Sequence, residues 1–304
     1  MSKYVIVGSG TVGGDVASLL AAQQHQVTVV SRSGGGSVSP LITGVALDAS
    51  NADELSRLAE GAAAIFNCAN PLYHRWPTDW PPIASALLVA AARSNAVLTT
   101  LSNLYVYGRA SGPMAPDAPL LADYEKAQVR ATMWRDALAA HERGELRACE
   151  VRASDFVGPG SQSVLGRLIP TLLKGKTCRV LGSPDQPHSW TYTHDVARTL
   201  VACAQRPEAW GEVWHAPTNE PRTQRDALNE LADLAGVPHV KVRSVPLVAL
   251  RAAGLFSPTL REFPTTLYQF TAPFVIDDTA TRLKLGLEPT PWPEVLLECV
   301  NAAR

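Results

Sequence analysis

The chain has 304 residues, of which 46% are hydrophobic and 18% are charged, and its formal net charge is −1 at pH 7. These values are typical of a globular protein with a sizeable core, and they argue against a basic nucleic-acid-binding surface. The longest apolar stretch, residues 83–92, has about half the length of a membrane span.

The cysteine and histidine patterns argue against disulfides and a metal site. The five cysteines are widely spaced, with no Cys-x-x-Cys pair, and no His-Glu-x-x-His pattern occurs. We therefore expect reduced thiols, no bound metal and a cytoplasmic protein. A predicted core strand follows Lys3 directly, so we expect no signal peptide.

The first thirty residues have the pattern of a strand, a glycine-rich turn, a helix and a second strand. Residues 4–7 form a short apolar run rich in β-branched side chains, which predicts a buried strand, and residues 25–30 are the predicted second strand. Between them, apolar residues repeat at helical spacing from Val12 to about Gln24. This order within about 30 residues predicts a dinucleotide-binding βαβ unit.

The glycine turn reads Gly8-Ser-Gly10-Thr-Val-Gly13. In such a unit the first glycine allows the sharp turn, the second lets the backbone approach a pyrophosphate, and the third lets the helix pack against the strand. Free backbone N–H groups and the positive end of the helix dipole then face the phosphates. We predict that the cofactor contacts this turn at Gly8, Gly10, Thr11, Val12 and Gly13.

The end of the second strand predicts which nucleotide is bound. An NAD site usually places Asp or Glu about 20 residues after the glycine turn, whereas an Arg there suits a 2′-phosphate. Here the strand ends Val30-Ser31-Arg32-Ser33, without a carboxylate. Arg32 can make a bidentate, charge-assisted contact, and Ser31 and Ser33 can add hydroxyl donors. We therefore favour NADP(H) over NAD(H); the alternative is a solvated arginine at a strand end.

Three more strands continue the alternation with helices. We expect strands over residues 44–48, 63–70 and 96–102, a helix that is capped by Ser50 with Asp53 three residues later and ends at Ala59, and a helix over 83–94. This alternation predicts an α/β fold, a Rossmann-type doubly wound parallel sheet. Ligands bind beyond the carboxyl ends of such strands. The cofactor is therefore expected to contact the residues that follow two of them: Asp48, Asn67, Cys68, Ala69 and Asn70.

The rest of the chain predicts two loops, a long helix and a smaller lobe. Residues 71–82 are expected to be an aromatic-rich loop, and residues 108–119 an irregular loop that is either a lid or an inert connection. A long helix over 122–143 precedes a strand over 146–153. Beyond it, prolines become frequent and helices shorter, with candidates over 223–235 and 247–255. The expected Rossmann domain comprises residues 1–155 and about 193–216, and the C-terminal substrate lobe comprises about 156–192 and 217–304.

Four motifs together resemble the extended short-chain dehydrogenase/reductase family, in its NAD(P)-dependent epimerase/dehydratase branch. They are the glycine turn, Leu101-Ser-Asn-Leu-Tyr-Val-Tyr-Gly108, Arg152-Ala-Ser-Asp-Phe-Val-Gly-Pro-Gly160 and Trp190-Thr-Tyr-Thr-His-Asp-Val-Ala197. The resemblance spans essentially the whole chain. It implies hydride transfer between a nicotinamide cofactor and a carbon bearing oxygen, and a monomer or homodimer. It also implies that Ser154, Asp155 and Phe156 line the nicotinamide side.

The resemblance implies a catalytic trio that this chain matches only in part. In the family a tyrosinate is the general acid/base, a serine hydrogen-bonds the substrate oxygen, and a lysine four residues after the tyrosine lowers its pKa. Ser102 is in place, but Gln128 stands four residues after Tyr124. Lys126 is only two residues after Tyr124, about 200° around a regular helix, so the two cannot act as the usual pair if that turn is regular.

Two arrangements would reconcile these residues with catalysis. The helix could begin only near Lys126, which would leave Tyr124 in a loop able to bend inward. Alternatively, Lys126 keeps a contact with the cofactor ribose, and the proton donor is Tyr105, Tyr107 or the substrate itself. The candidate catalytic residues are therefore Ser102, Tyr105, Tyr124 and Lys126.

These residues predict an NADP(H)-dependent oxidoreductase or epimerase/dehydratase-like enzyme that acts on a small molecule, without a nucleic-acid or membrane partner. A redox-neutral reaction would consume no net NADPH. The alternative function is an NADP(H)-binding sensor or regulatory protein that has lost catalysis, which the unusual tyrosine–lysine spacing supports. Four aromatic residues either wall an apolar substrate pocket or belong to the core: Trp76, Trp80, Trp190 and Tyr268.

Overall fold

The central element is a seven-stranded sheet in the computed structural model, which describes residues 1–35, 39–159 and 164–304. Its strands are β1 (Lys3–Val7), β2 (Gln26–Ser31), β3 (Ile42–Ala46), β4 (Ala62–Asn67), β5 (Val97–Asn103), β6 (Arg147–Ala153) and β10 (Val213–His215). They lie in the order β10-β6-β5-β4-β1-β2-β3, and the pairs from β3 to β5 are parallel. This is the strand order of a dinucleotide-binding domain with one further strand, so the predicted fold class is confirmed.

The chain forms two compact units, and the sheet belongs mainly to the first. The first unit comprises residues 1–106, 123–152 and 196–214, and the second comprises residues 107–122, 153–195 and 215–304. Residues 107–122, which the sequence places in the Rossmann domain, group with the second unit. The reason is a backbone pairing in which Met114 N–H donates to the Val275 carbonyl and Asp277 N–H donates to the Met114 carbonyl.

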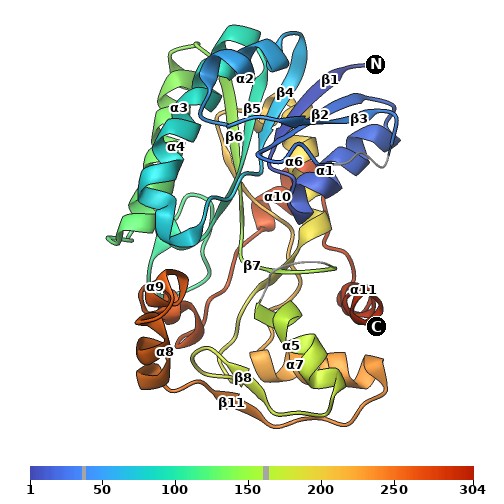
Figure 1. Ribbon diagram of the computed structural model, residues 1–304, viewed down its shortest axis with the longest axis vertical. Coiled ribbons are helices and arrows are strands. Elements are labelled where there is room, and N and C mark those ends of the chain that lie inside the picture. Colours follow the sequence, from blue (N-terminus) through green and yellow to red (C-terminus); the bar gives the residue numbers. More distant parts are fainter. Residues whose placement is uncertain (36–38, 160–163) are drawn as a thin grey trace. The chain divides into compact units, whose positions relative to one another are not determined.

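Helices cover both faces of the sheet (Figure 1). They are α1 (Thr11–Ala22), α2 (Ala52–Ala59), α3 (Trp76–Ser94), α4 (Glu125–Glu142) and α6 (Thr193–Gln205), with short 3₁₀ turns η1 (Tyr73–Arg75), η2 (Tyr105–Tyr107) and η3 (Pro207–Ala209). Val5 and Val7 pack with side chains of α2, α3 and α4. Tyr4 and Ile6 are buried on the opposite face, because successive side chains of a strand alternate.

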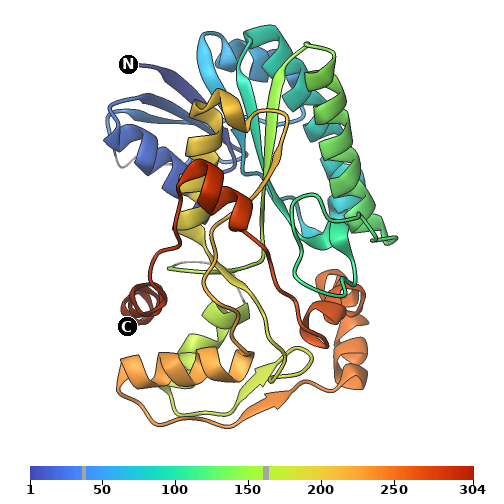
Figure 2. The same ribbon diagram turned by 180° about the vertical axis from the view of Figure 1, so that it is seen from behind.

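The second unit is built from short strands and a helical core (Figure 2). Its strands are β7 (Asp155–Val157), β8 (Cys178–Val180), β9 (Trp190–Tyr192) and β11 (Val242–Ser244). Strands β7 and β9 pair in parallel, as do β8 and β11. The helices are α5 (Val164–Leu173), α7 (Gln224–Ala235), α8 (Leu247–Gly254), α9 (Pro258–Thr266), α10 (Thr279–Leu285) and α11 (Trp292–Ala303), with η4 (Leu267–Phe270). Side chains of α5, α7 and α11 share one apolar core.

Helix α3 begins earlier than the sequence pattern predicts. Most of residues 71–82, expected to be a loop, belongs to η1 and α3, although α3 contains Pro81 and Pro82. A proline inside a helix costs about 3 kcal/mol. Trp76 and Trp80, one helical turn apart, are both buried against Met133. Burying an indole contributes about 4–6 kcal/mol, which outweighs the lost helical hydrogen bonds.

Two helix starts differ from the expected residues. Asn51, rather than Ser50 with Asp53, caps α2, because its side chain accepts from the Glu54 N–H at 3.1 Å while the Ser50 hydroxyl donates to Asp48 at 2.8 Å. Helix α4 begins at Glu125 rather than at residue 122. None of the described helices is both long and apolar enough to cross a bilayer.

Candidate active site

The glycine turn between β1 and α1 combines two tightly packed glycines with one that faces open space. Gly8 has a φ of +114°, and a Cβ placed on it would lie 2.4 Å from the Cys68 carbonyl oxygen. A Cβ on Gly13 would lie 2.0 Å from the Gly8 carbonyl oxygen. A Cβ on Gly10 would meet no described heavy atom within 4 Å. Packing therefore requires Gly8 and Gly13, whereas Gly10 leaves room for a ligand to approach the backbone.

The first turn of α1 suits an anionic group. Gly10, the N-cap, has no side chain to cap the first N–H groups, and the first turn carries no acidic residue. The backbone N–H groups and the positive end of the helix dipole therefore favour phosphates at this position. The residues present fit the pyrophosphate of a dinucleotide, with Thr11 and Val12 in that first turn.

We expect Gly13→Ala to weaken binding of a nicotinamide dinucleotide at least tenfold, because the added methyl overlaps a backbone oxygen and forces β1 and α1 apart. Overpacking of this kind costs about 1–3 kcal/mol of stability. Gly14→Ala is the matched control, since its Cβ would meet no described heavy atom within 4 Å and alanine favours a helix. Fluorescence titration and thermal unfolding of both variants check this. Wild-type affinity in Gly13→Ala would contradict the assignment.

The predicted adenosine end lies in the same unit, after β2 and β3. The Ser31 hydroxyl accepts from the Gly34 N–H at 3.1 Å, so this side chain holds the turn that carries Arg32 and Ser33. The Ser50 backbone N–H and hydroxyl bind the Asp48 carboxylate and, with a smaller contribution from the charge of Arg32, lower its pKa. Arg32 and Asp48 are therefore within electrostatic reach of each other.

The residues after β4 lie beside the glycine turn. The Cys68 N–H donates to the Val7 carbonyl at 2.8 Å, and Asn67 Oδ1 accepts from the Ala69 N–H at 3.3 Å. Asn67 Nδ2 is buried, with no hydrogen-bond partner among the described residues. Burial raises the pKa of the Cys68 thiol to about 12, so this side chain is an unreactive thiol. Asn70 follows in the same loop.

Tyr124 lies outside α4. It is the N-cap of the helix, with extended backbone angles (φ −89°, ψ 152°), and its ring centroid lies 6.1 Å from that of Tyr105. The start of α4 at Glu125 agrees with the arrangement in which Tyr124 is left in the preceding loop. The regular helical turn that would separate Tyr124 and Lys126 by about 200° is therefore not formed.

Lys126 and two tyrosines form a contiguous group in the first unit. The Lys126 side chain is buried, and its ammonium lies 4.7 Å from the ring centroid of Tyr73. The Tyr73 and Tyr105 hydroxyl oxygens are 3.1 Å apart. The structure thus brings the candidates Tyr105, Tyr124 and Lys126 together, and it adds Tyr73, for which the sequence offered no motif.

Tyr107 is held in the core of the second unit. Its hydroxyl lies 2.8 Å from Nε2 of His215, whose Nδ1 lies 2.8 Å from the Asp277 carbonyl oxygen. A carbonyl only accepts, so Nδ1 carries the hydrogen and Nε2 accepts from Tyr107. Both side chains are fully buried. This removes Tyr107 from the candidate proton donors.

Ser102 is buried at the end of β5, with 3% of its surface exposed. Its hydroxyl has no hydrogen-bond partner among the described residues. A buried hydroxyl without a partner costs about 1–3 kcal/mol, so the group is available to a ligand oxygen or water. The contact with a substrate oxygen stays a prediction.

Arg130 follows Lys126 by one turn on the same face of α4, and sequence reasoning missed it. Its guanidinium carbon lies 4.6 Å from the ring centroid of Trp76 and 4.3 Å from that of Trp80, and Nη1 donates to the Leu101 carbonyl at 3.2 Å. The signal was present in the sequence, because both the two cations and the two tryptophans are four residues apart.

The four aromatic residues for which the sequence left open a substrate pocket or the core are buried in the structure. Trp76 and Trp80 are buried and pack around Arg130, while Trp190 and Tyr268 are buried within the second unit. All four are at most 8% exposed. Burial of large apolar rings stabilises the two units, so these residues belong to the core.

A buried ion pair lies on β6. Glu150 accepts from Nε of Arg152 at 2.6 Å, and each side chain is 1% exposed.

Burial lowers the pKa of the Arg130 guanidinium to about 10, while the charge of Glu150 and, more weakly, that of an ionised Tyr105 oppose this shift. Arg130 therefore stays cationic at neutral pH.

The residues expected on the nicotinamide side belong to the second unit. The Ser154 N–H donates to Oγ1 of Thr191 at 3.1 Å. Asp155 lies 2.9 Å from Nε2 of the buried His188, and Phe156 is half-buried next to it on β7. The structure assigns Ser154 and Asp155 internal contacts, and their cofactor role stays a prediction. Gly160 of the same motif lies outside the described residues.

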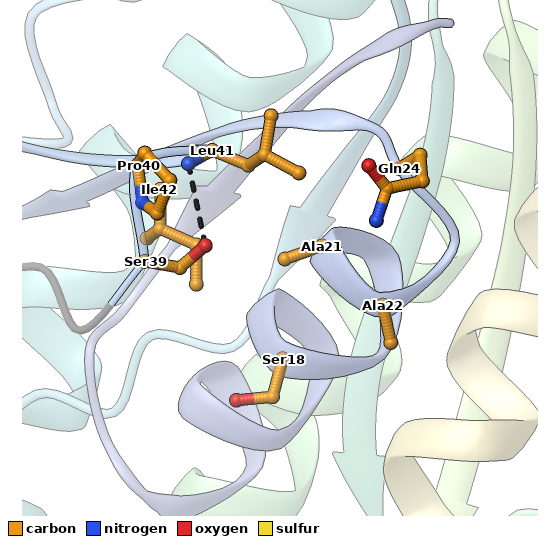
Figure 3. A pocket seen from close by; sticks show the side chains of 8 residues that line it. All are labelled: Ser18, Ala21, Ala22, Gln24, Ser39, Pro40, Leu41 and Ile42. Atoms are coloured by element: carbon orange, nitrogen blue, oxygen red, sulfur yellow. Dashed lines mark hydrogen bonds between the residues drawn. The ribbon is translucent and has the colours of Figure 1, made fainter.

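A surface pocket lies apart from these residues, and the described residues contain no candidate metal centre. Among the described residues, no three His, Cys, Asp or Glu side chains gather to hold a metal ion. A depression of about 520 Å³ lies at the end of α1 and the start of β3 (Figure 3). It is lined by Ser18, Ala21, Ala22, Gln24, Ser39, Pro40, Leu41 and Ile42. None of these is a predicted site residue.

Solved structures that share this fold include a dehydratase and two epimerases whose names refer to nucleotide sugars. A dTDP-glucose 4,6-dehydratase from Bacillus anthracis in complex with NAD has 15% identity and a TM-score of 0.81, covering 99% of this chain and 96% of that one. A UDP-glucose 4-epimerase from Thermotoga maritima with UDP-glucose has 16% identity and a TM-score of 0.80, covering 99% and 98%. A UDP-glucuronic acid 4-epimerase from Bacillus cereus, in complex with NAD, has 18% identity and a TM-score of 0.80, covering 99% and 98%.

A match to a family model identifies the family, whereas the similar solved structures show the fold alone. No curated protein sequence matches the chain. The family model described as NAD dependent epimerase/dehydratase family matches residues 4–215, which include the glycine turn, the residues around Ser102 and the first turns of α4. The chain belongs to the NAD-dependent epimerase/dehydratase family.

Proposed function

We propose that the protein is an NADP(H)-dependent enzyme that acts at a carbon bearing oxygen, with Tyr105 as its general acid/base. The observation that carries this proposal is the group formed by Lys126, Tyr73 and Tyr105 in the unit that also contains the glycine turn. Similar solved structures include a UDP-glucose 4-epimerase with UDP-glucose and a dTDP-glucose 4,6-dehydratase. Nucleotide sugars are therefore the first substrate class to test.

The chain's own residues have separate tasks in this proposal. A bound nicotinamide dinucleotide supplies two-electron oxidation or reduction at the substrate carbon. Tyr105 gives a proton to the substrate oxygen or takes one from it, and Ser102 hydrogen-bonds that oxygen. The Tyr73 hydroxyl, 3.1 Å away, donates to Tyr105 when Tyr105 is ionised. The Lys126 ammonium places a positive charge against the Tyr73 ring.

The preference for NADPH rests on Arg32. We expect Arg32→Ala to weaken NADPH binding about 10- to 100-fold and to leave NADH binding nearly unchanged, because a charge-assisted contact contributes about 1.5–3 kcal/mol. Arg57→Ala is the control, since Arg57 is an exposed arginine on α2. Fluorescence titration with both nucleotides measures the effect. If Arg32→Ala keeps the wild-type preference, the 2′-phosphate assignment is wrong; if neither nucleotide binds the wild type, the enzyme assignment fails.

A second candidate function is an NADP(H)-binding sensor without catalysis. Ala122 stands four residues before Lys126, and α4 begins only at Glu125, so no tyrosine lies one helical turn before the lysine. Incubation of the NADPH complex with carbonyl compounds and nucleotide sugars separates the candidates. Oxidation of NADPH or conversion of the sugar supports the enzyme. Tight binding without either change supports the sensor.

A further inference from the structure

Arg130 brings a fixed positive charge into the interior of the first unit. Its side chain is 5% exposed, and its guanidinium lies over two indole rings while donating to the Leu101 carbonyl. Among the described residues it forms no ion pair, and its Nε has no hydrogen-bond partner. Glu150, the carboxylate that acts on it, is bound directly to Arg152. An anion that forms near Arg130 is therefore stabilised.

Tyr105 is placed to carry that anion. The Trp76 ring, which packs on Arg130, lies 6.0 Å from the Tyr105 ring and 5.3 Å from the Tyr73 ring. The electrostatic interaction between Tyr105 and the Arg130 guanidinium favours the charged form of both groups.

We propose that Arg130 is a positioning residue that favours the phenolate of Tyr105, the task that a lysine one helical turn after the tyrosine would otherwise perform. The inference rests on the proposed function, in which Tyr105 is the acid/base. The ionisation moves the hydroxyl proton of Tyr105 to the substrate oxygen or to solvent and leaves the negative charge on the phenolate. Arg130 touches neither substrate nor cofactor in this role.

Several other groups around Tyr105 also affect its ionisation. The Tyr73 hydroxyl comes from η1, the Tyr124 ring from the loop before α4, and the Lys126 ammonium from α4. Glu150 on β6 opposes the effect of Arg130 on an anion. Because Tyr73 and Tyr105 share a hydrogen bond, their titration is that of a pair.

The test is a pH titration of tyrosinate ultraviolet absorbance, which needs no substrate. The difference between wild type and Tyr105→Phe isolates the transition that depends on Tyr105, and the same difference is taken in the Arg130→Gln background. We expect Arg130→Gln to raise the midpoint by about one pH unit, a tenfold loss of phenolate at a given pH. Arg135→Gln, an exposed arginine on the same helix, is the control and leaves the midpoint unchanged.

Arg130→Lys separates charge from packing. It keeps the positive charge, so we expect a midpoint within a few tenths of a pH unit of the wild type, even where thermal stability falls. An unchanged midpoint in Arg130→Gln overturns the proposal, and so does an equal shift in Arg130→Lys and Arg130→Gln, which would indicate a packing role. If Tyr105→Phe keeps full turnover, the proposed function fails. Turnover is measured by enzyme kinetics, so this result is distinguished from failure of the Arg130 proposal, which the pH titration measures.

Discussion

Tyr105→Phe is expected to lower turnover by about two to four orders of magnitude, because general acid/base catalysis by one side chain contributes about 10²–10⁴-fold. The phenylalanine ring keeps the packing against Trp76 and Tyr124 and removes only the hydroxyl that lies 3.1 Å from that of Tyr73. The loss should therefore appear in kcat, while NADPH affinity stays near the wild-type value. Steady-state kinetics with the first active nucleotide sugar or carbonyl compound, together with cofactor titration, measure both.

Tyr124→Phe is the comparison that decides between the two tyrosines. Tyr124 lies outside α4 with its ring 6.1 Å from that of Tyr105, so we expect its hydroxyl to contribute less than tenfold. The opposite ranking, a large loss in Tyr124→Phe and a small one in Tyr105→Phe, would assign the proton transfer to Tyr124. Equal and small losses would leave the substrate itself as the proton donor.

Glu150→Ala is expected to lower the free energy of unfolding by about 3–5 kcal/mol, the usual effect of removing one partner of a buried ion pair. Glu150 and Arg152 are each 1% exposed, and their contact of 2.6 Å is out of reach of water. Without Glu150, Arg152 and the neighbouring Arg130 keep their buried charges with less compensation. Urea unfolding followed by circular dichroism measures the loss.

Glu145→Ala provides a matched control for this effect. Arg143 and Glu145 also form an Arg–Glu pair two residues apart, with a contact of 2.7 Å, but both side chains are more than half exposed. Because solvent screens an exposed pair, its removal should not measurably change stability. Replacing both Glu150 and Arg152 by Met should cost less than Glu150→Ala, since no uncompensated charge is left. A Glu150→Ala variant as stable as Glu145→Ala would contradict this account.

The sequence was most informative where local chemistry and strand order determine the structure. The turn from Gly8 to Gly13 was predictable, because its glycines are needed for a positive φ and for close packing. The parallel sheet followed from alternating apolar strands and helices. The start of α3 was not predictable, since its prolines indicate a loop. Only the burial of Trp76 and Trp80, which depends on the packing of α4, keeps those residues helical.

The candidate site also has features that the sequence predicts and features that only the tertiary structure reveals. The sequence by itself determined the α/β class, the cofactor turn, and the fact that Tyr124 and Lys126 are wrongly spaced for the usual pair. The tertiary structure alone decided which tyrosine lies near the buried cations, because Tyr73, Tyr105 and Arg130 come from three separate elements. Residue spacing predicts contacts within one helix or strand. Contacts between elements depend on how those elements pack, which local sequence patterns do not encode.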